Sequence, residues 1–201
     1  MDCRVRRNGL AIPRVSSEPK KSLSPKEARR VAIGFVLLTG LFAFVLYPYF
    51  RPAPARFAVA NIPDFELELI SGGSSGDRVR RIDLTDKPLI LDFWASWCAP
   101  CRGQTHSLIQ AYPKLAERAT VLGIATGEPL EAAKKYALES ATPYSNAYDD
   151  DGLLARTLSV STLPTLLIVD PTGRILAATT KQLSAEEIVG LLDTALESAE
   201  N

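Results

Sequence analysis

The sequence predicts an α/β domain that follows a long apolar segment near the start of the chain. Residues 31–50 run without a single charge. From residue 64 onward, apolar runs of strand length alternate with segments of helical periodicity. This alternation is typical of a central mixed sheet with helices on both faces. One compact apolar run, Leu89–Trp94, leads directly to Cys98 and Cys101.

Length, charge and cysteine content restrict the function classes. A chain of 201 residues is long enough for one well-buried domain with an appendage. Residues 1–30 carry nine Lys or Arg against three Asp or Glu, whereas residues 51–201 carry fourteen against twenty. An acidic body argues against a nucleic-acid-binding domain, which is usually basic. Three cysteines are too few for a scaffold held by disulfides, and Cys3 is interpreted as a free thiol.

Residues 31–50 predict a transmembrane anchor. Twenty apolar residues match the length of a helix that crosses a bilayer, and Tyr47 and Tyr49 suit the headgroup boundary. Residues 1–30 are then a cytoplasmic basic tail, because positive charge flanks the cytoplasmic end of such helices. The rest of the chain would face the periplasm or an equivalent outer space. A cleaved signal peptide is the alternative, favoured by the small residues Ala53 and Ala55, although its apolar core is usually shorter.

Residues 51–63 are expected to form a short, stiff tether, since they contain three prolines. The domain then spans residues 64–201. It opens with apolar residues at 65, 67 and 69 that alternate with acids, a pattern that predicts a half-buried strand. A turn rich in glycine and serine at 71–77 and a returning strand at 79–84 complete a predicted hairpin.

The remaining elements continue the alternation. Strands are expected at 89–94, 121–125, 145–148, 165–169 and 174–179, the last two joined by a turn at Asp170–Gly173. Helices are expected from Cys101 to Leu115, at 129–139, at 153–158 and after the capping box Ser184–Glu187. Asp149–Gly152 is interpreted as a turn that caps the next helix, because the later ligands of a calcium loop are absent.

Cys98 and Cys101 form a Cys-x-x-Cys motif at a strand-to-helix junction. At the start of a helix, free N–H groups and the helix dipole favour a thiolate and lower the pKa of a thiol such as Cys98. A thiolate attacks a disulfide sulfur, and Cys101, one turn deeper, is placed to attack the resulting mixed disulfide. Pro100 suits an early helical position, where no N–H partner is needed. Half of a zinc site is the alternative, but residues 51–201 contain one histidine and no other cysteine.

The segment Asp-Phe-Trp-Ala-Ser-Trp-Cys-Ala-Pro-Cys at 92–101 resembles the active site of the thioredoxin superfamily. The anchor, the added hairpin and the Asp-Phe-Glu-Leu start at 64–67 resemble its membrane-anchored TlpA/ResA-type branch, which includes the thioredoxins of cytochrome c maturation. The resemblance covers residues 60–198 and implies a thioredoxin-like fold. Thr162–Thr165 is similar to the family's cis-proline loop, so Leu163 and Pro164 are expected to face the cysteines and pair with an extended substrate. Taken alone, Pro164 is only a proline at the entry of a strand.

The resemblance also implies the other site residues. Trp97, Ala99 and Pro100 are expected to contribute to the substrate surface beside the thiolate. Asp92 matches the buried acid to which proton transfer is assigned in thioredoxin. Burial in an apolar strand raises the pKa of a carboxyl, so Asp92 is expected to accept the proton of Cys101 near neutral pH. The alternative is an acid at a strand end that reaches solvent, and residues 121–125 lack the family's lysine partner.

Two residues of the helix depart from the pattern of the branch. Gln104 and His106 stand where many members have glutamate and proline. His106 falls away from the apolar face of the helix and is expected at the surface.

The predicted function is that of a membrane-anchored thiol–disulfide oxidoreductase. The resemblance implies reduction of protein disulfides in the periplasm, with apocytochrome c as a candidate substrate and a membrane thiol transporter as electron donor. The Cys98–Cys101 disulfide is the redox group, and no cofactor, metal or nucleic acid is expected. The alternatives are a net disulfide oxidant, because the motif does not set the direction of electron flow, and a binding or chaperone module on the same scaffold. A peroxide-reducing enzyme is disfavoured, since Ala95 stands where the Thr of a Thr-x-x-Cys motif would be.

Overall fold

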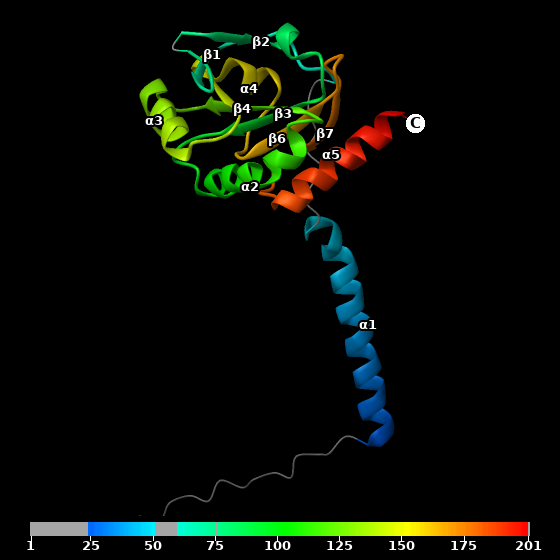
Figure 1. Cartoon of the computed structure of the whole chain (residues 1–201). Coiled ribbons are helices and arrows are strands. Elements are labelled where there is room, and N and C mark those ends of the chain that lie inside the picture. Colours follow the sequence, from blue (N-terminus) through cyan, green and yellow to red (C-terminus); the bar gives the residue numbers. More distant parts are fainter. Residues whose placement is uncertain (1–23, 51–59, 75, 201) are drawn as a thin grey trace, which may run out of the picture. The chain divides into compact units, whose positions relative to one another are not determined.

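The computed structural model describes residues 24–50, 60–74 and 76–200 of the chain (Figure 1). Two compact units are present, Met1–Pro52 and Ala53–Asn201, and each is described by itself. Most of the predicted basic tail (residues 1–23) and most of the predicted tether (residues 51–59) lie outside the described residues.

The first unit contains one helix, α1 (Pro25–Phe50). It begins before the apolar segment, because Ser24 and Glu27 form a capping box in which each side chain accepts a hydrogen bond from the other's backbone N–H. The last residues of the predicted tail are therefore helical. Apolar side chains along the described part of the helix are exposed, among them Phe35, Leu38 and Phe42. Within the described residues, no helix combines the length and the apolarity needed to span a membrane.

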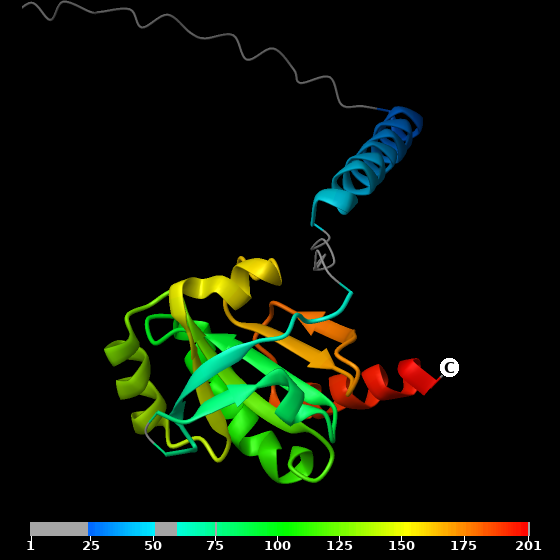
Figure 2. The same cartoon turned by 90° about the horizontal axis from the view of Figure 1, so that it is seen from above.

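The second unit is built on a seven-stranded mixed sheet with the order β2-β1-β5-β4-β3-β6-β7 (Figure 2). The strands are β1 (Glu66–Ser71), β2 (Arg78–Arg80), β3 (Leu89–Trp94), β4 (Thr120–Thr126), β5 (Ser145–Asp149), β6 (Thr165–Val169) and β7 (Ile175–Thr179). The pairs β3–β4 and β4–β5 are parallel, and the other pairs are antiparallel. This arrangement confirms the predicted mixed sheet.

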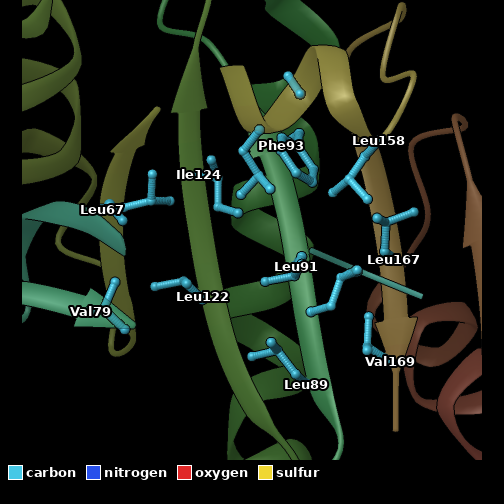
Figure 3. Close-up of a cluster of buried hydrophobic side chains, with 14 residues drawn as sticks. Leu67, Val79, Leu89, Leu91, Phe93, Leu122, Ile124, Leu158, Leu167 and Val169 are labelled. Atoms are coloured by element: carbon cyan, nitrogen blue, oxygen red, sulfur yellow. The ribbon is translucent and has the colours of Figure 1, made fainter. Parts of the chain in front are cut away.

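Helices cover both faces of the sheet. They are α2 (Ala99–Leu115), α3 (Leu130–Ser140), α4 (Leu153–Thr157) and α5 (Ala185–Glu200), with short 3-10 turns η1 (Arg81–Leu84) and η2 (Asp150–Gly152). On one face, Leu91 and Phe93 of β3 pack with Leu154 of α4, in the cluster of Figure 3. On the other face, Ile90 packs with Leu108 of α2 and with Ile188 of α5. Alternate side chains of β3 therefore enter opposite cores.

Most predicted elements lie within a few residues of the observed ones, and β3 and β6 have the predicted bounds. The capping box before α5 is also present, since Ser184 N–H donates to the Glu187 carboxylate. The returning strand of the hairpin is shorter than predicted. β2 ends at Arg80, and the chain continues as η1, in which Ile82 is exposed. The apolar alternation is lost after Val79, so the strand has nothing further to bury.

All six residues of β3 are buried, and the strand pairs with β4 on one side and β6 on the other. Such a central strand is a rigid base for a side chain placed at its end. Its carboxyl end is followed by the cysteine motif and α2.

Candidate active site

Cys98 and Cys101 lie at the start of α2 and form a disulfide, with 5.3 Å between their Cα atoms. Cys98 is the N-cap residue of the helix, and its Sγ accepts a hydrogen bond from Cys101 N–H at 3.2 Å. Pro100 lies in the first turn, as predicted. Cys98 retains 4% exposure and Cys101 none. Of the two sulfurs, that of Cys98 is therefore the one that a substrate can approach, and the helix start favours its thiolate.

The loop before β6 lies against the cysteines. The Leu163–Pro164 peptide bond is cis, which agrees with the predicted cis-proline loop. Leu163 packs against the apolar cluster that contains Cys98, Cys101 and Trp94. Residues from distant parts of the chain, the cysteine motif and Leu163–Pro164, thus meet at one end of the sheet.

An open surface surrounds Cys98. Trp97 is 67% exposed, and Ala99 and Pro100 are exposed as well. A groove of ≈ 320 Å³ is lined by Trp97, by Leu163 and by residues of η2 and α4. Trp97 lies at the edge of this groove, and its Nε1–H donates a hydrogen bond to the Gly127 carbonyl at 3.4 Å. The predicted substrate residues are therefore gathered around the more accessible sulfur.

Asp92 is completely buried in β3, and neither of its carboxylate oxygens has a hydrogen-bond partner. This burial excludes the alternative of an acid that reaches solvent. Loss of hydration raises the pKa of Asp92 to about 7. Its backbone neighbours across the sheet are Gly123 in β4 and Leu166 in β6, neither of which can pair with a carboxylate through its side chain.

Asp92 faces α2 near Cys101. On β3, Asp92 lies between Ile90 and Trp94 on the same face. Ile90 shares its apolar cluster with Leu108 of α2, and Trp94 shares its cluster with Cys101. The segment of α2 opposite Asp92 is consequently the turn that follows Cys101.

Gln104 occupies that turn. It is fully buried, its Oε1 accepts a hydrogen bond from Leu183 N–H at 2.8 Å, and its Nε2 has no partner. Among the described residues, Asp92 and Gln104 hold the only buried side-chain polar atoms without a hydrogen-bond partner. His106, by contrast, is exposed and contacts Gln110, as expected from its position on the helix.

Sequence reasoning missed a set of polar residues beside the motif. Ser96 contacts the Glu128 carboxylate and the Arg102 guanidinium, and Arg102 also lies 5.4 Å from the centre of the Tyr136 ring. No spacing in the sequence connects Ser96 with Glu128, because they meet only through the pairing of β3 with β4. The fold alone brings them together.

The acidic turn before α4 has a structural role. The Asp149 carboxylate accepts hydrogen bonds from Leu154 and Ala155 N–H at 2.8 and 2.9 Å, so it caps α4. In the part of the chain that the structure describes, no three His, Cys, Asp or Glu side chains form a group suited to a metal ion.

Comparison with known proteins gives consistent matches. The profile of the AhpC/TSA family matches residues 59–178. The thiol-disulfide oxidoreductase ResA of Bacillus cereus is 25% identical over 162 residues, which cover 80% of this chain and 87% of the relative. The thiol:disulfide interchange protein DsbE of Pseudomonas fluorescens is 32% identical over 149 residues, which cover 72% of this chain and 79% of the relative.

A solved structure agrees with these relatives. That of a putative thiol:disulfide interchange protein DsbE from Chlorobium tepidum has a TM-score of 0.59 and 27% identity, and the match covers 70% of this chain and 96% of that one. The fold of the present chain, its Cys-x-x-Cys pair and its relatives together identify a thioredoxin-like redox enzyme. It is a thiol–disulfide oxidoreductase of ResA/DsbE type. The chain belongs to the AhpC/TSA family.

Proposed function

We propose that the protein is a membrane-anchored reductase of protein disulfides whose domain faces the periplasm or an equivalent outer space. The observation that carries the proposal is the position of Cys98, which caps α2 and lies beside a cis-proline loop. A nucleophilic thiolate and a surface for an extended polypeptide are the two requirements of protein disulfide exchange. The names ResA and DsbE of the relatives support the same reaction class.

The reduced dithiol acts in two steps. The Cys98 thiolate attacks one sulfur of the substrate disulfide, forms a mixed disulfide and releases the other substrate sulfur as a thiolate. Cys101 then gives its proton to Asp92 and attacks Cys98 Sγ. The mixed disulfide breaks, the second substrate thiolate leaves, and the Cys98–Cys101 disulfide is formed. Two electrons have moved to the substrate, and the enzyme is left in the oxidised state that the structure shows.

Substrate contacts come from both sides of Cys98. Trp97, Ala99 and Pro100 supply one part of the surface, and Leu163 and Pro164 supply the other. The backbone of Leu163 pairs with an extended segment of the substrate. We propose a protein disulfide as the substrate, with apocytochrome c as the specific case, and a membrane thiol transporter as the source of electrons. No metal or organic cofactor takes part in this cycle.

The anchor is residues 31–50, which are twenty residues long and uncharged. The basic residues that precede them set the N-terminus on the cytoplasmic side. Fractionation of cells, with protease added to intact spheroplasts, tests this arrangement. Protein that stays with the membrane and loses its domain to external protease supports it, whereas protein recovered in the soluble fraction contradicts an uncleaved anchor.

Trapping in cells tests the function itself. In the Cys101→Ala variant the second step is blocked, so mixed disulfides with Cys98 should accumulate and can be identified. The double variant Cys98→Ala/Cys101→Ala is the control and should trap nothing. Capture of apocytochromes supports the specific substrate, and the absence of any disulfide-linked protein favours a binding module. Equilibration of the wild-type dithiol with glutathione decides between a net reductant and a net oxidant.

A further inference from the structure

Ser96 lies two residues before Cys98, in the connection between β3 and α2, and all of its polar groups are engaged. Its N–H donates to the Glu128 carboxylate at 2.8 Å, and its hydroxyl donates to the other oxygen of the same carboxylate. Its carbonyl accepts a hydrogen bond from Arg102 Nη2 at 3.0 Å. A residue bonded in this way is fixed from both sides.

The segment that provides Glu128 is itself anchored. The Glu128 carbonyl accepts a hydrogen bond from the Tyr148 hydroxyl at 2.8 Å, so the loop after β4 is tied to β5. The neighbouring Gly127 carbonyl accepts the indole N–H of Trp97. Two successive residues of this loop thus hold two successive residues of the connection that leads to Cys98. Glu128 is half-buried at this contact, whereas Gly127 and Trp97 are exposed.

Charge adds a second effect to this contact. The charged groups around the Cys98 connection are Glu128 from the loop after β4 and Arg102 from α2. Asp151 of η2 and Arg156 of α4 line the same groove as Trp97. Asp92 of β3 lies below the helix. The helix start and the Arg102 guanidinium favour a thiolate at Cys98, whereas the Glu128 carboxylate opposes it. A less stable thiolate makes the reduced dithiol less stable and therefore a stronger reductant.

We propose that Glu128 is a positioning residue of the active site, which fixes the Ser96–Trp97 connection through both carboxylate oxygens and, by its charge, keeps the Cys98–Cys101 dithiol reducing. The proposal rests on the reductase function proposed above. It adds a determinant of the direction of electron flow that lies outside the Cys-x-x-Cys motif and the cis-proline loop.

Two substitutions separate the position of Glu128 from its charge. Glu128→Gln keeps the length and one acceptor oxygen but removes the charge, whereas Glu128→Asp keeps the charge but shortens the side chain. Glu131→Gln is the matched control, because Glu131 is exposed in the first turn of α3 and its loss changes the net charge equally. The variants are made in the full chain, and folding is checked by circular dichroism.

Three properties of each protein are measured, and the third is the time-resolved fluorescence anisotropy of its tryptophans. The ionisation of Cys98 is followed by the ultraviolet absorbance of the thiolate, and the dithiol is equilibrated with glutathione. For Glu128→Gln we expect the ratio of thiolate to thiol at a given pH to rise about threefold to tenfold, and the equilibrium to shift toward the reduced dithiol. In Glu128→Asp the Cys98 thiol should titrate close to wild type, but the tryptophan anisotropy should decay faster, because Trp97 is held less firmly. Glu131→Gln should match wild type in all three properties.

A Glu128→Gln protein with the thiolate titration and glutathione equilibrium of wild type would overturn the proposal. So would an equal change in Glu131→Gln, which would show a general charge effect. If Glu128→Gln does not fold, Glu128→Asp decides. A Cys98 thiol that titrates far from its wild-type pH in Glu128→Asp contradicts the charge effect, and a Cys98 thiol that titrates as in wild type supports it. A wild-type protein that does not exchange with glutathione would instead refute the reductase function, so the two failures are distinguishable.

Discussion

Two carboxylates near the cysteines are held in opposite ways. Glu128 lies on the rim of the site, in the loop after β4 beside the cysteine motif. It is half-buried and accepts two hydrogen bonds from Ser96. Asp92, below α2, has no exposed surface and no hydrogen-bond partner. One accepts hydrogen bonds from the connection that precedes α2, and the other lies in the interior without a donor.

The difference shows how one site can use the same chemical group for two purposes. Hydrogen bonds from donors favour the charged form of a carboxylate, and burial without donors favours the protonated form. Glu128 is therefore suited to hold the backbone of the Ser96–Trp97 connection. Asp92, with its pKa raised to about 7 by burial, is suited to take up and release a proton at neutral pH.

The largest effect concerns the pH dependence of stability of the oxidised protein. The pKa of Asp92 is about 7 in the folded state, raised by burial from the ordinary value of 3.8. Between these two values the unfolded state binds fewer protons than the folded state, so stability falls as pH rises. Asp92 should lower the free energy of unfolding by roughly 4 kcal/mol in total between about pH 4 and pH 7.

The Asp92→Asn variant should lack this decline. Denaturant unfolding at several pH values measures both proteins, and Glu131→Gln serves as a control for a lost surface charge. Relative to wild type, Asp92→Asn should gain stability steadily as pH rises toward about 7 and should gain no more above it. Parallel pH profiles for the two proteins would show that Asp92 is hydrated in the folded state.

The second effect is on the resolution of mixed disulfides. Without the Asp92 carboxylate, Cys101 must lose its proton to water, so Asp92→Asn should slow resolution roughly 100-fold near neutral pH. Formation of the mixed disulfide by Cys98 should change far less. In wild type the rate of resolution should rise through about pH 7, since only the ionised carboxylate can accept the proton. Stopped-flow measurement of both steps decides, and equal slowing of the two would contradict the role of Asp92.

The third effect concerns the buried hydrogen bond between Trp94 and Asn146, next to Asp92 in the sheet. Trp94 is on the same face of β3, but its Nε1–H donates to Asn146 Oδ1 at 3.0 Å. Gly123, the neighbour of Asp92 in β4, leaves room for this bond, because an added Cβ would lie 2.1 Å from Asn146 Oδ1 and 2.9 Å from Trp94 Nε1. Gly123→Ala should therefore break the bond and cost about 2 kcal/mol of stability.

Thermal or denaturant unfolding measures this cost. The control is Gly190→Ala in α5, where an added Cβ meets nothing within 4 Å. That substitution should leave stability unchanged or raise it by about 0.5–1 kcal/mol, since alanine favours a helix. A Gly123→Ala protein as stable as wild type would mean that Trp94 and Asn146 can move apart without loss.

The buried carboxylate could be found from the sequence, and the rim carboxylate could not. Asp92 interrupts a run of apolar residues. Such a run predicts a central strand, and β3 is buried along its whole length, so an acid within the run is buried too. Cys98, Cys101 and Pro164 also carried local signals. Glu128 and Ser96 are ordinary polar residues far apart in the chain, and their contact depends on the register of β3 with β4. Likewise, nothing local indicated that Gln104 would be buried with one unsatisfied amide nitrogen.

The smallest effect comes from Ser96→Ala. The substitution removes the hydroxyl that donates to Glu128 but keeps the backbone N–H bond to the same carboxylate. Loss of one side-chain hydrogen bond should cost about 1 kcal/mol in the free energy of unfolding.

The charge of Glu128 is still present in Ser96→Ala, so the thiolate titration of Cys98 and the glutathione equilibrium should match wild type. Resolution should also proceed at the wild-type rate, because Asp92 is untouched. A Ser96→Ala protein whose Cys98 titration shifts as far as that of Glu128→Gln would mean that geometry, not charge, sets the stability of the thiolate. Glu128 would then act on Cys98 by fixing the position of the connection and not by its charge. The two carboxylates would still differ in one respect, because only Asp92 takes up a proton.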